Sequence, residues 1–311
     1  MSRTVIVVGA TGFIGRNLCR AAAERGLRVI GVSRSGDTAV EGCERVMALD
    51  GLDSLAPLPA DTALFHVAAA RYDATRFQDM QVETLNANAE LATRIYAFCA
   101  AHGIREVRLA SSSGVYPAGV AVMDDAVPLD LNAPPHKGEA FYAWSKRWSE
   151  IVATLYAERF GISTVAFRLS NPYGPFDSTD LKAAHVAPAF VMKALSDSPS
   201  FELLGNPDAE RDFIYAGDVA DVFLRSLDWQ GRSDVFNLCT GETTSMRVLA
   251  ETALKAAGAD KPIVLAGTPG GIAVRRLTAD RLRAAFGIER FTPLLDGLTK
   301  TAEWYRHALR S

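Results

Sequence analysis

The chain has 311 residues, of which 49% are hydrophobic and 22% are charged, as in average globular proteins. This composition excludes a disordered, a collagen-like and a disulfide-scaffold protein. The 33 Lys and Arg against 36 Asp and Glu give a net charge of −3. Because no basic block stands out, we expect neither a nucleic-acid partner nor a membrane-surface partner. The length corresponds to about two domains.

Neither the cysteines nor the N-terminus indicates export. The sequence has no C-x-x-C pair and no metal-ligand spacing, so we expect no metal site and buried, reduced thiols at Cys19, Cys43, Cys99 and Cys239. The N-terminus runs directly into the apolar residues 5–8 without a signal-peptide pattern. No apolar run approaches the ~18 residues of a membrane span. We therefore expect a cytoplasmic protein.

Short β-branched runs alternate with segments of helical period, which favours βαβ units and a parallel sheet. In chain order the pattern predicts strands at residues 5–8, 28–32, 45–49, 63–67, 106–110 and 163–169, and helices at residues 15–25, 82–102 and 142–160. Beyond residue 171 prolines interrupt the alternation, and a helix ending near residue 309 closes the chain. The predicted fold class is α/β, with a Rossmann-type doubly wound parallel sheet and a smaller mixed α/β lobe.

A glycine-rich turn with the spacing G-x-x-G-x-x-G follows the first predicted strand. Such a turn needs its first glycine for the tight bend, its second for close approach to a pyrophosphate and its third for helix–strand packing. The free N–H groups of the following helix would face the phosphates. The strand–turn–helix context predicts a dinucleotide site formed by Gly9, Thr11, Gly12, Phe13, Ile14 and Gly15.

The residues after the second strand favour NADP over NAD. An NAD site carries an acid there to bind the ribose 2′-hydroxyl, whereas this chain has Ser33 and Arg34. Arg34 would pair with a 2′-phosphate through its planar fork. The alternative is that Arg34 is a solvated loop charge and NAD is the cofactor. Asp50, after the third strand, is a candidate contact to the adenine edge or a simple turn residue.

Two further patterns carry acid–base chemistry. Tyr142 and Lys146 form a Y-x-x-x-K pair, which places the phenol and the ammonium on one helix face, one turn apart. The lysine cation would favour the phenolate and prepare Tyr142 as a general acid and base. The serine cluster 111–113 ends a predicted strand, where a hydroxyl would face the ligand crevice of an open α/β sheet. The alternative for an isolated run of three serines is that they form the turn at the end of the strand.

Together these motifs resemble the extended short-chain dehydrogenase/reductases, specifically the NAD(P)-dependent epimerase/dehydratase family of sugar-nucleotide enzymes. The resemblance covers almost the whole chain. It extends to residues 66–69, to Asn86, and to the stretches 168–175, 211–220 and 236–238. The family places the catalytic hydroxyl four residues before the tyrosine at position 116, which selects Ser112.

The resemblance implies a role for each candidate site residue. Tyr142 would exchange the proton, Ser112 would polarise the same oxygen, and Lys146 would hold the nicotinamide ribose. Ala68 would lie at the cofactor. The substrate, a nucleotide-diphosphate sugar, would contact Ser113, Asn171, His185 and Arg211. For Arg211 the alternative is an ion pair with a neighbouring acid.

Departures from the family patterns reduce the number of reactions that remain candidates for this chain. Ser113 and Gly114 replace the Asp-Glu pair of the 4,6-dehydratases, which disfavours dehydration. Pro117 and His185 resemble GDP-fucose synthase, but Gly114 stands where that enzyme has its cysteine acid/base. An NADPH-dependent reduction of a 4-keto (6-deoxy) sugar nucleotide at C4 needs only Ser112, Tyr142 and Lys146, and is favoured. The alternatives are an NAD-dependent UDP-sugar 4-epimerase and a non-catalytic NADP sensor.

The resemblance also implies a domain division and an assembly. Residues 1–170 and about 209–235 would form the NAD(P)-binding Rossmann domain, and about 171–208 and 236–311 the sugar-nucleotide-binding lobe. The family often forms homodimers through two helices per subunit. Those helices would be the ones around residues 82–102 and 145–160.

Overall fold

The computed structural model describes residues 3–55, 57–70, 79–267 and 273–310. The chain forms two compact units. Unit 1 contains residues 1–118, 128–169 and 219–236, and unit 2 contains residues 119–127, 170–218 and 237–311.

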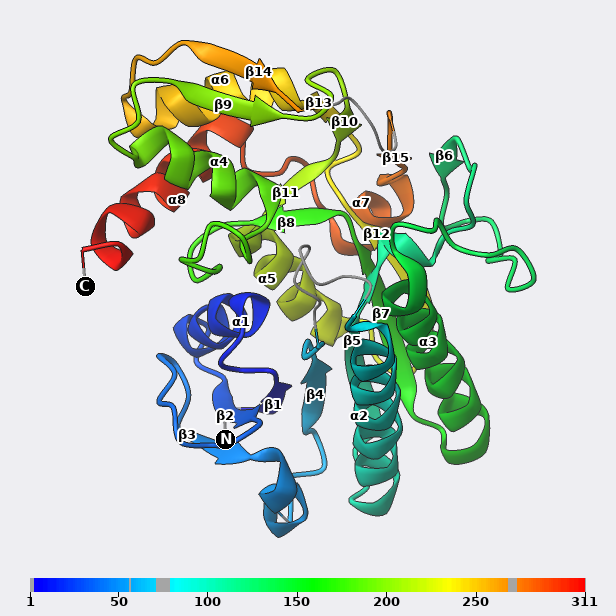
Figure 1. The fold of residues 1–311 in the computed structure, drawn as a ribbon. Helices are drawn as coiled ribbons and strands as arrows, with labels where there is room; N and C mark the ends of the chain where they lie inside the picture. The colour runs from blue at the N-terminus through cyan, green and yellow to red at the C-terminus, as the bar shows by residue number, and fades with distance from the viewer. Residues whose placement is uncertain (1–2, 56, 71–78, 268–272, 311) are drawn as a thin grey trace. The chain divides into compact units, whose positions relative to one another are not determined.

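Unit 1 is organised around a seven-stranded sheet with the order β12-β7-β5-β4-β1-β2-β3 (Figure 1). The strand pairs from β7 through β5, β4, β1 and β2 to β3 are all parallel. The strands are β1 (Thr4–Val8), β2 (Arg28–Ser33), β3 (Arg45–Ala48), β4 (Ala63–His66), β5 (Glu106–Ser112), β7 (Ser163–Leu169) and β12 (Asp234–Leu238). The strand order reverses between β1 and β4, which is the topological switch point where open α/β sheets bind ligands. The predicted fold class is confirmed.

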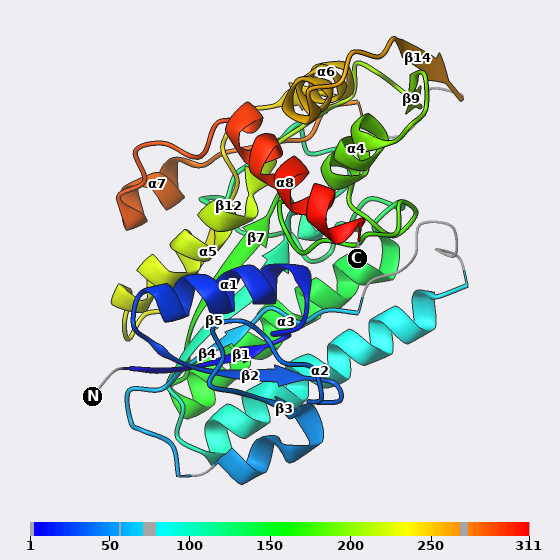
Figure 2. The same ribbon diagram turned by 90° about the vertical axis from the view of Figure 1, so that its left-hand side faces the viewer.

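Helices cover both faces of this sheet (Figure 2). One face carries α1 (Phe13–Glu24) and α5 (Ala216–Arg225), and the other carries α2 (Gln81–Ala101) and α3 (Ala140–Phe160). Short 3-10 turns lie at η1 (Leu49–Leu55), η3 (Ser113–Val115) and η4 (Ser226–Asp228). The strands and helices predicted up to residue 169 are all present, with ends within two residues of the expected ones.

The alternation of side chains along the strands explains the two-layer core. Ile6, Val8 and Leu64 pack with Ile95 of α2 and Val152 of α3 in one buried cluster. On the opposite face, Phe65 and Phe167 contact Phe223 of α5, with ring centroids 6.1 and 4.7 Å apart. Strands buried on both faces read as continuous apolar runs, as β1 does.

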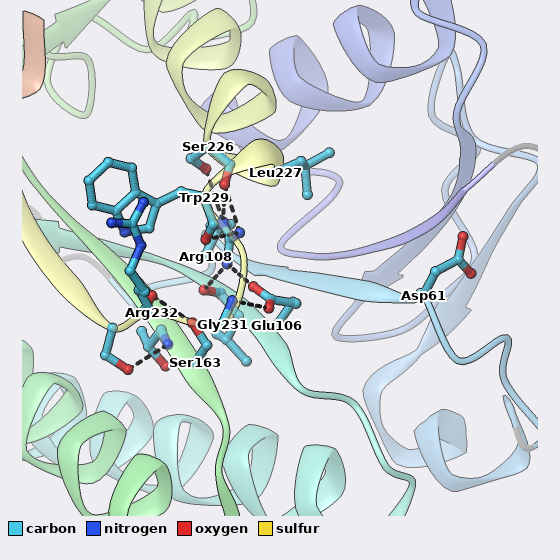
Figure 3. Close-up of polar contacts among 12 residues, drawn as sticks. Asp61, Glu106, Arg108, Ser163, Ser226, Leu227, Trp229, Gly231 and Arg232 are labelled. Atoms are coloured by element: carbon cyan, nitrogen blue, oxygen red, sulfur yellow. Dashed lines mark hydrogen bonds and ion pairs between the residues drawn. The ribbon is translucent and has the colours of Figure 1, made fainter. Parts of the chain in front are cut away.

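A fully buried arginine fastens η4 to the sheet (Figure 3). Arg108 of β5 has no exposed surface. Its Nε and Nη2 donate to the Ser226 carbonyl oxygen at 3.1 and 2.7 Å, and its Nη1 donates to Glu106 Oε2 at 2.9 Å. The backbone N–H of Gly231 donates to the other Glu106 oxygen at 2.9 Å. The segment 226–231 is therefore held by the same ion pair that lies within β5.

Unit 2 is a mixed α/β unit with small sheets. Its apolar core joins Tyr173, Phe190, Phe201, Leu249 and Leu298. The helices are α4 (Val186–Leu195), α6 (Met246–Ala257), α7 (Asp280–Phe286) and α8 (Leu294–Ala308). Two-stranded sheets pair β8 (Asn171–Tyr173) with β11 (Phe213–Tyr215), β9 (Phe201–Leu204) with β14 (Ile263–Ala266), β10 (Glu210–Arg211) with β13 (Thr244–Ser245), and β6 (Val122–Met123) with β15 (Arg276–Leu277).

These units differ from the expected division in two segments. Residues 119–127 lie in unit 2, because β6 pairs with β15 and Asp125 Oδ2 accepts from the backbone N–H of Asn237 at 2.7 Å. Residues 209–218 also lie in unit 2, because β10 and β11 pair with β13 and β8 of that unit.

Candidate active site

The glycine turn between β1 and α1 leaves no room for side chains. Gly9 has a φ of +96°, and a Cβ there would lie 2.7 Å from the backbone N of Ala68. A Cβ on Gly15 would lie 2.0 Å from the Gly9 carbonyl oxygen. Gly12 precedes α1, and within the described residues no side chain caps this helix and its first turn has no acid. The turn therefore presents bare backbone at a helix N-terminus, which suits a pyrophosphate.

Thr11, Phe13 and Ile14 complete this turn and the start of α1. The Arg16 Nε donates to the Thr11 carbonyl oxygen at 3.0 Å, and the Asn17 side-chain amide donates to that of Phe13 at 2.9 Å. These bonds to carbonyl oxygens fix the turn from the helix side. The backbone N–H of Gly9 is fixed from the sheet side, since it donates to Val32 of β2 at 2.8 Å.

The end of β2 presents one buried and one exposed polar residue. Ser33 is buried, and its Oγ accepts from the backbone N–H of Gly36 at 2.9 Å. Arg34 is exposed, and no hydrogen bond or ion pair joins it to another described residue. Asp50 lies in η1, where Arg94 Nη1 donates to its carboxylate at 2.8 Å. A guanidinium exposed at the end of β2 is chemically suited to pair with a phosphate.

Ser112, Tyr142 and Lys146 lie on two adjacent elements of unit 1. Ser112 ends β5, and its Oγ accepts from the backbone N–H of Gly114 at 3.1 Å, which leaves the hydroxyl proton available to donate. Tyr142 lies in the first turn of α3, half-buried. Lys146 follows one turn later, with its Nζ 5.8 Å from the Tyr142 ring centroid and donating to the Ala110 carbonyl oxygen at 2.8 Å.

Burial changes the chemistry of Lys146. The side chain is almost fully buried, and this burial lowers the pKa of Lys146 to about 8, an effect that the charge of Glu150 opposes. His66, at the end of β4, is buried nearby. Burial, with the charge of Lys146, lowers the pKa of His66 to about 3, so its imidazole is neutral. Lys146 is thus a cation near neutral pH that loses its proton more readily than an exposed lysine.

The sequence did not identify an amide that braces this site. Asn86, the residue that the resemblance singled out, is exposed, whereas Asn88 is buried. Asn88 Oδ1 accepts from the backbone N–H of Ala70 at 2.7 Å, and its Nδ2 donates to Ser145 Oγ at 3.2 Å. Ser145 Oγ in turn donates to the Tyr142 carbonyl oxygen at 2.7 Å. A shift of two positions along α2 separates the two asparagines.

Glu139 was also missed. A Cβ built on Gly114 would lie 3.2 Å from Glu139 Oε2 and 3.3 Å from Ser112 Oγ. A carboxylate oxygen therefore lies beside Gly114, close to the Ser112 hydroxyl oxygen. Ser113, the other substrate candidate of this segment, is buried in η3.

The remaining substrate candidates lie in unit 2. Asn171 begins β8, and its Nδ2 donates to the Asp212 carbonyl oxygen at 2.8 Å. Arg211 lies in β10, and its Nη1 donates to the Glu210 carbonyl oxygen at 2.7 Å. His185 precedes α4, where its Nδ1 pairs with the buried Asp177 Oδ2 at 2.5 Å. Beside Asp177, Phe176 has a φ of +70°, the one positive φ of a non-glycine residue within the described ranges.

Within the described residues, no group of three or more His, Cys, Asp or Glu side chains is arranged to hold a metal ion. None of the described helices combines the length and the apolar character needed to cross a bilayer.

Comparison with known proteins decides the family. Residues 5–239 match the model of the NAD dependent epimerase/dehydratase family. The chain belongs to this family. The expected family and enzyme class, an extended short-chain dehydrogenase/reductase, are thus confirmed.

The relatives catalyse more than one reaction. The chain is 28% identical to a dTDP-4-dehydro-6-deoxy-D-allose reductase of Streptomyces bikiniensis, over 99% of this chain and 98% of the relative. It is 26% identical to a UDP-glucose 4-epimerase of Mycolicibacterium smegmatis, over 97% and 98%. The solved UDP-glucose 4-epimerase of Thermus thermophilus, in complex with NAD, superimposes with a TM-score of 0.80 at 23% identity, covering 98% of this chain and 99% of that one.

Proposed function

We propose that this protein is an NADP-dependent reductase that acts at C4 of a 4-keto-6-deoxy sugar nucleotide. The observation that carries the proposal is the placement of Tyr142 and Lys146 one turn apart on α3, with Lys146 Nζ bound to the strand that ends in Ser112. The similarity to a dTDP-4-dehydro-6-deoxy-D-allose reductase over nearly the whole length of both chains supports the substrate class.

Each of the three side chains has a distinct part. Ser112 donates its hydroxyl proton to the C4 carbonyl oxygen, which can only accept. The backbone N–H of Gly114 holds the Ser112 Oγ in place without using that proton. Tyr142 delivers a proton to the same oxygen as it becomes a hydroxyl. After Tyr142 has given up its proton, the Lys146 ammonium stabilises the resulting phenolate. The Ala110 carbonyl oxygen holds Lys146 in place. NADPH, when bound, supplies the hydride.

The cofactor residues fit a dinucleotide. Gly9, Gly12 and Gly15, with the N-terminus of α1, would hold the pyrophosphate, since glycine leaves this cradle without side chains of its own. Ala68 forms its wall beside Gly9. Arg34 would pair with the 2′-phosphate of NADP, and Asp50 would lie at the adenine edge. Unit 1 is in this proposal the cofactor-binding unit.

The substrate diphosphate is assigned to Asn171 and Arg211, and the sugar to Ser113 and His185. The guanidinium of Arg211 is suited to a diphosphate. The buried Asp177 fixes the imidazole of His185, and the strained backbone of Phe176 beside it is typical of functional segments. Unit 2 is in this proposal the sugar-nucleotide-binding unit.

A second candidate is a UDP-sugar 4-epimerase with NAD. It is supported by the similarity to the M. smegmatis enzyme over 97% of this chain. The same three catalytic residues serve that reaction. Two sequence features disfavour it: Ser33 and Arg34 stand where the NAD-binding acid would be, and the Pro-Gly-Asp of such epimerases is Pro-Gly-Gly here, at positions 269–271, outside the described residues.

A homodimer is proposed through α2 and α3. Phe141, Trp144, Trp148 and Leu155 have exposed fractions of 46%, 37%, 44% and 55%, and their spacing places them on one face of α3. Large apolar side chains gathered on one helix face are typical of an interface. The cytoplasmic location stays a prediction.

The deciding experiment begins with the nucleotide released from the freshly purified, denatured protein. The reductase predicts little bound NAD, consumption of added NADPH with a dTDP- or GDP-4-keto-6-deoxy sugar, and a C4-reduced product by NMR. Stoichiometric bound NAD with interconversion of UDP-glucose and UDP-galactose, and without NADPH consumption, would instead establish the epimerase.

A further inference from the structure

Two of the four cysteines lie against each other beside the cofactor-binding helix. Cys19 is fully buried in α1. Cys43, just before β3, is only half-buried, whereas the sequence predicted a buried thiol there. Their side chains hydrogen-bond to each other. Cys99 and Cys239 are both fully buried.

Two glycines create this contact. Gly42 has a φ of +85°, and a Cβ there would lie 2.6 Å from the carbonyl oxygen of Cys19, so the turn before Cys43 packs directly on α1. On the other side, a Cβ on Gly31 of β2 would lie 3.0 Å from Cys43 Sγ. The missing side chain of Gly31 leaves the space that the Cys43 sulfur occupies between sheet and helix.

The two thiols differ in reactivity. The hydrogen bond from Cys19 lowers the pKa of Cys43, against the effect of burial. The same hydrogen bond, together with burial, raises the pKa of Cys19. Cys19 is thus the proton donor and Cys43 the thiolate candidate, and the thiolate is the form that reacts with oxidants. Burial raises the pKa values of Cys99 and Cys239, which makes both inert.

We propose that Cys19 and Cys43 form a reversible disulfide when the protein meets hydrogen peroxide. The Cys43 thiolate attacks one peroxide oxygen, so an S–O bond forms, the O–O bond breaks, and the leaving hydroxide takes a proton to become water. The Cys19 sulfur then attacks the Cys43 sulfenic acid, forming the S–S bond and releasing a second water. Two thiols are oxidised by two electrons, and one peroxide is reduced to two waters.

The disulfide would close a covalent ring around β2. This ring contains Ser33 and Arg34, the segment that we propose selects the cofactor. Oxidation therefore joins α1 to the turn before β3 and restricts the chain between them. The thiol chemistry itself does not depend on the proposed reaction, so it can be tested without a substrate.

The test is a peroxide titration of the full chain, followed by thiol counting after denaturation and by peptide mapping. We expect the free thiols to fall from four to two per chain, with the peptides of Cys19 and Cys43 linked and restored by dithiothreitol. Cys43→Ser should abolish the thiol loss, and Cys19→Ser should leave a Cys43 sulfenic acid that dimedone traps. The control Cys99→Ser should still form the link.

Two results would overturn the proposal. One is oxidation of Cys43 to the sulfinic acid in the wild-type protein with no linked peptide. The other is loss of Cys99 or Cys239 at the same peroxide concentration as the pair. Because both are read on the wild-type chain, they hold even if a serine variant fails to fold.

Discussion

Arg168 grips the Glu150 carboxylate with two parallel bonds, Nε to Oε1 at 3.0 Å and Nη2 to Oε2 at 2.8 Å. Ser111 Oγ adds a third bond to Oε1 at 2.5 Å. Both side chains of the ion pair are largely buried, and Glu150 lies one turn after Lys146 on α3. The carboxylate is thus fixed where its charge favours the protonated form of Lys146.

This arrangement predicts the alkaline limb of the pH profile. The pKa of Lys146 is lowered to about 8, so the ammonium is present below that pH and lost as pH rises through it. We therefore expect kcat/KM for reduction to fall above a pH of about 8. Glu150→Gln removes the charge that raises the pKa of Lys146, so the fall should begin at lower pH. A profile identical to wild type in a folded Glu150→Gln variant would contradict this; Glu158→Gln, exposed on the same helix, is the control.

Tyr142→Phe tests the proton donor. Removing the hydroxyl while keeping the ring should lower kcat by at least about a hundredfold, the usual contribution of a general acid. NADP affinity should stay close to wild type, because Lys146 keeps its bond to Ala110. Steady-state rates and cofactor titration by fluorescence give the two quantities. Turnover at the wild-type rate would remove Tyr142 from the mechanism.

Arg34→Asp tests cofactor selection. A charge-assisted hydrogen bond to the 2′-phosphate would be replaced by repulsion, so the ratio of NADP to NAD affinity should fall by at least about tenfold. Dissociation constants for both nucleotides provide the ratio. Arg45→Asp makes the same charge change on an exposed residue of β3 and should leave it unaltered. If the ratio of NADP to NAD affinity is unchanged in Arg34→Asp, residues other than Arg34 discriminate between the two cofactors.

The exposed stripe of α3 predicts the assembly. The double variant Trp148→Lys and Leu155→Lys places two charges on this stripe and should convert the homodimer into a folded monomer. The molar mass from light scattering after size-exclusion chromatography measures this change. Glu158→Lys, which is exposed but polar, should leave the mass unchanged. A wild-type protein that is monomeric at micromolar concentration would refute the dimer.

Arg108→Met should destabilise the fold, although Arg108 is not one of the proposed catalytic residues. The substitution leaves the Ser226 carbonyl oxygen and Glu106 without their buried partner, which costs about 3 kcal/mol. Urea unfolding measures this loss. Arg105→Met, on an exposed arginine of the same region, should cost far less. Equal costs for the two would mean that the buried pair contributes little.

The sequence predicted those parts of the fold that depend on interactions between residues close together in the chain. The apolar run of β1, the glycine turn and the Tyr142–Lys146 spacing each follow from short-range rules, and their places in unit 1 agree with them. Glu150 was within reach as well, because it shares a helix face with Lys146 at a spacing of four. Arg168 lies on another strand, and only the tertiary fold brings its guanidinium to that carboxylate.

The place of the segment 119–127 in unit 2 could not be predicted from local sequence patterns. Its two-residue strand β6 is too short for a periodic signal, and its partner β15 lies more than 150 residues further along the chain. Asn88 was missed for a related reason: two asparagines on α2 look alike in sequence, and only packing distinguishes the buried one.

The interleaving of the two units has a consequence for biosynthesis. The chain passes between them after residues 118, 127, 169, 218 and 236. A ribosome therefore delivers the edge strand β12 only after a large part of unit 2 has been synthesised, and unit 1 cannot finish folding before residue 236 has emerged. A nascent chain stalled before residue 234 would expose the sheet edge at β7. Premature truncation should thus yield an aggregating fragment rather than a free cofactor-binding module.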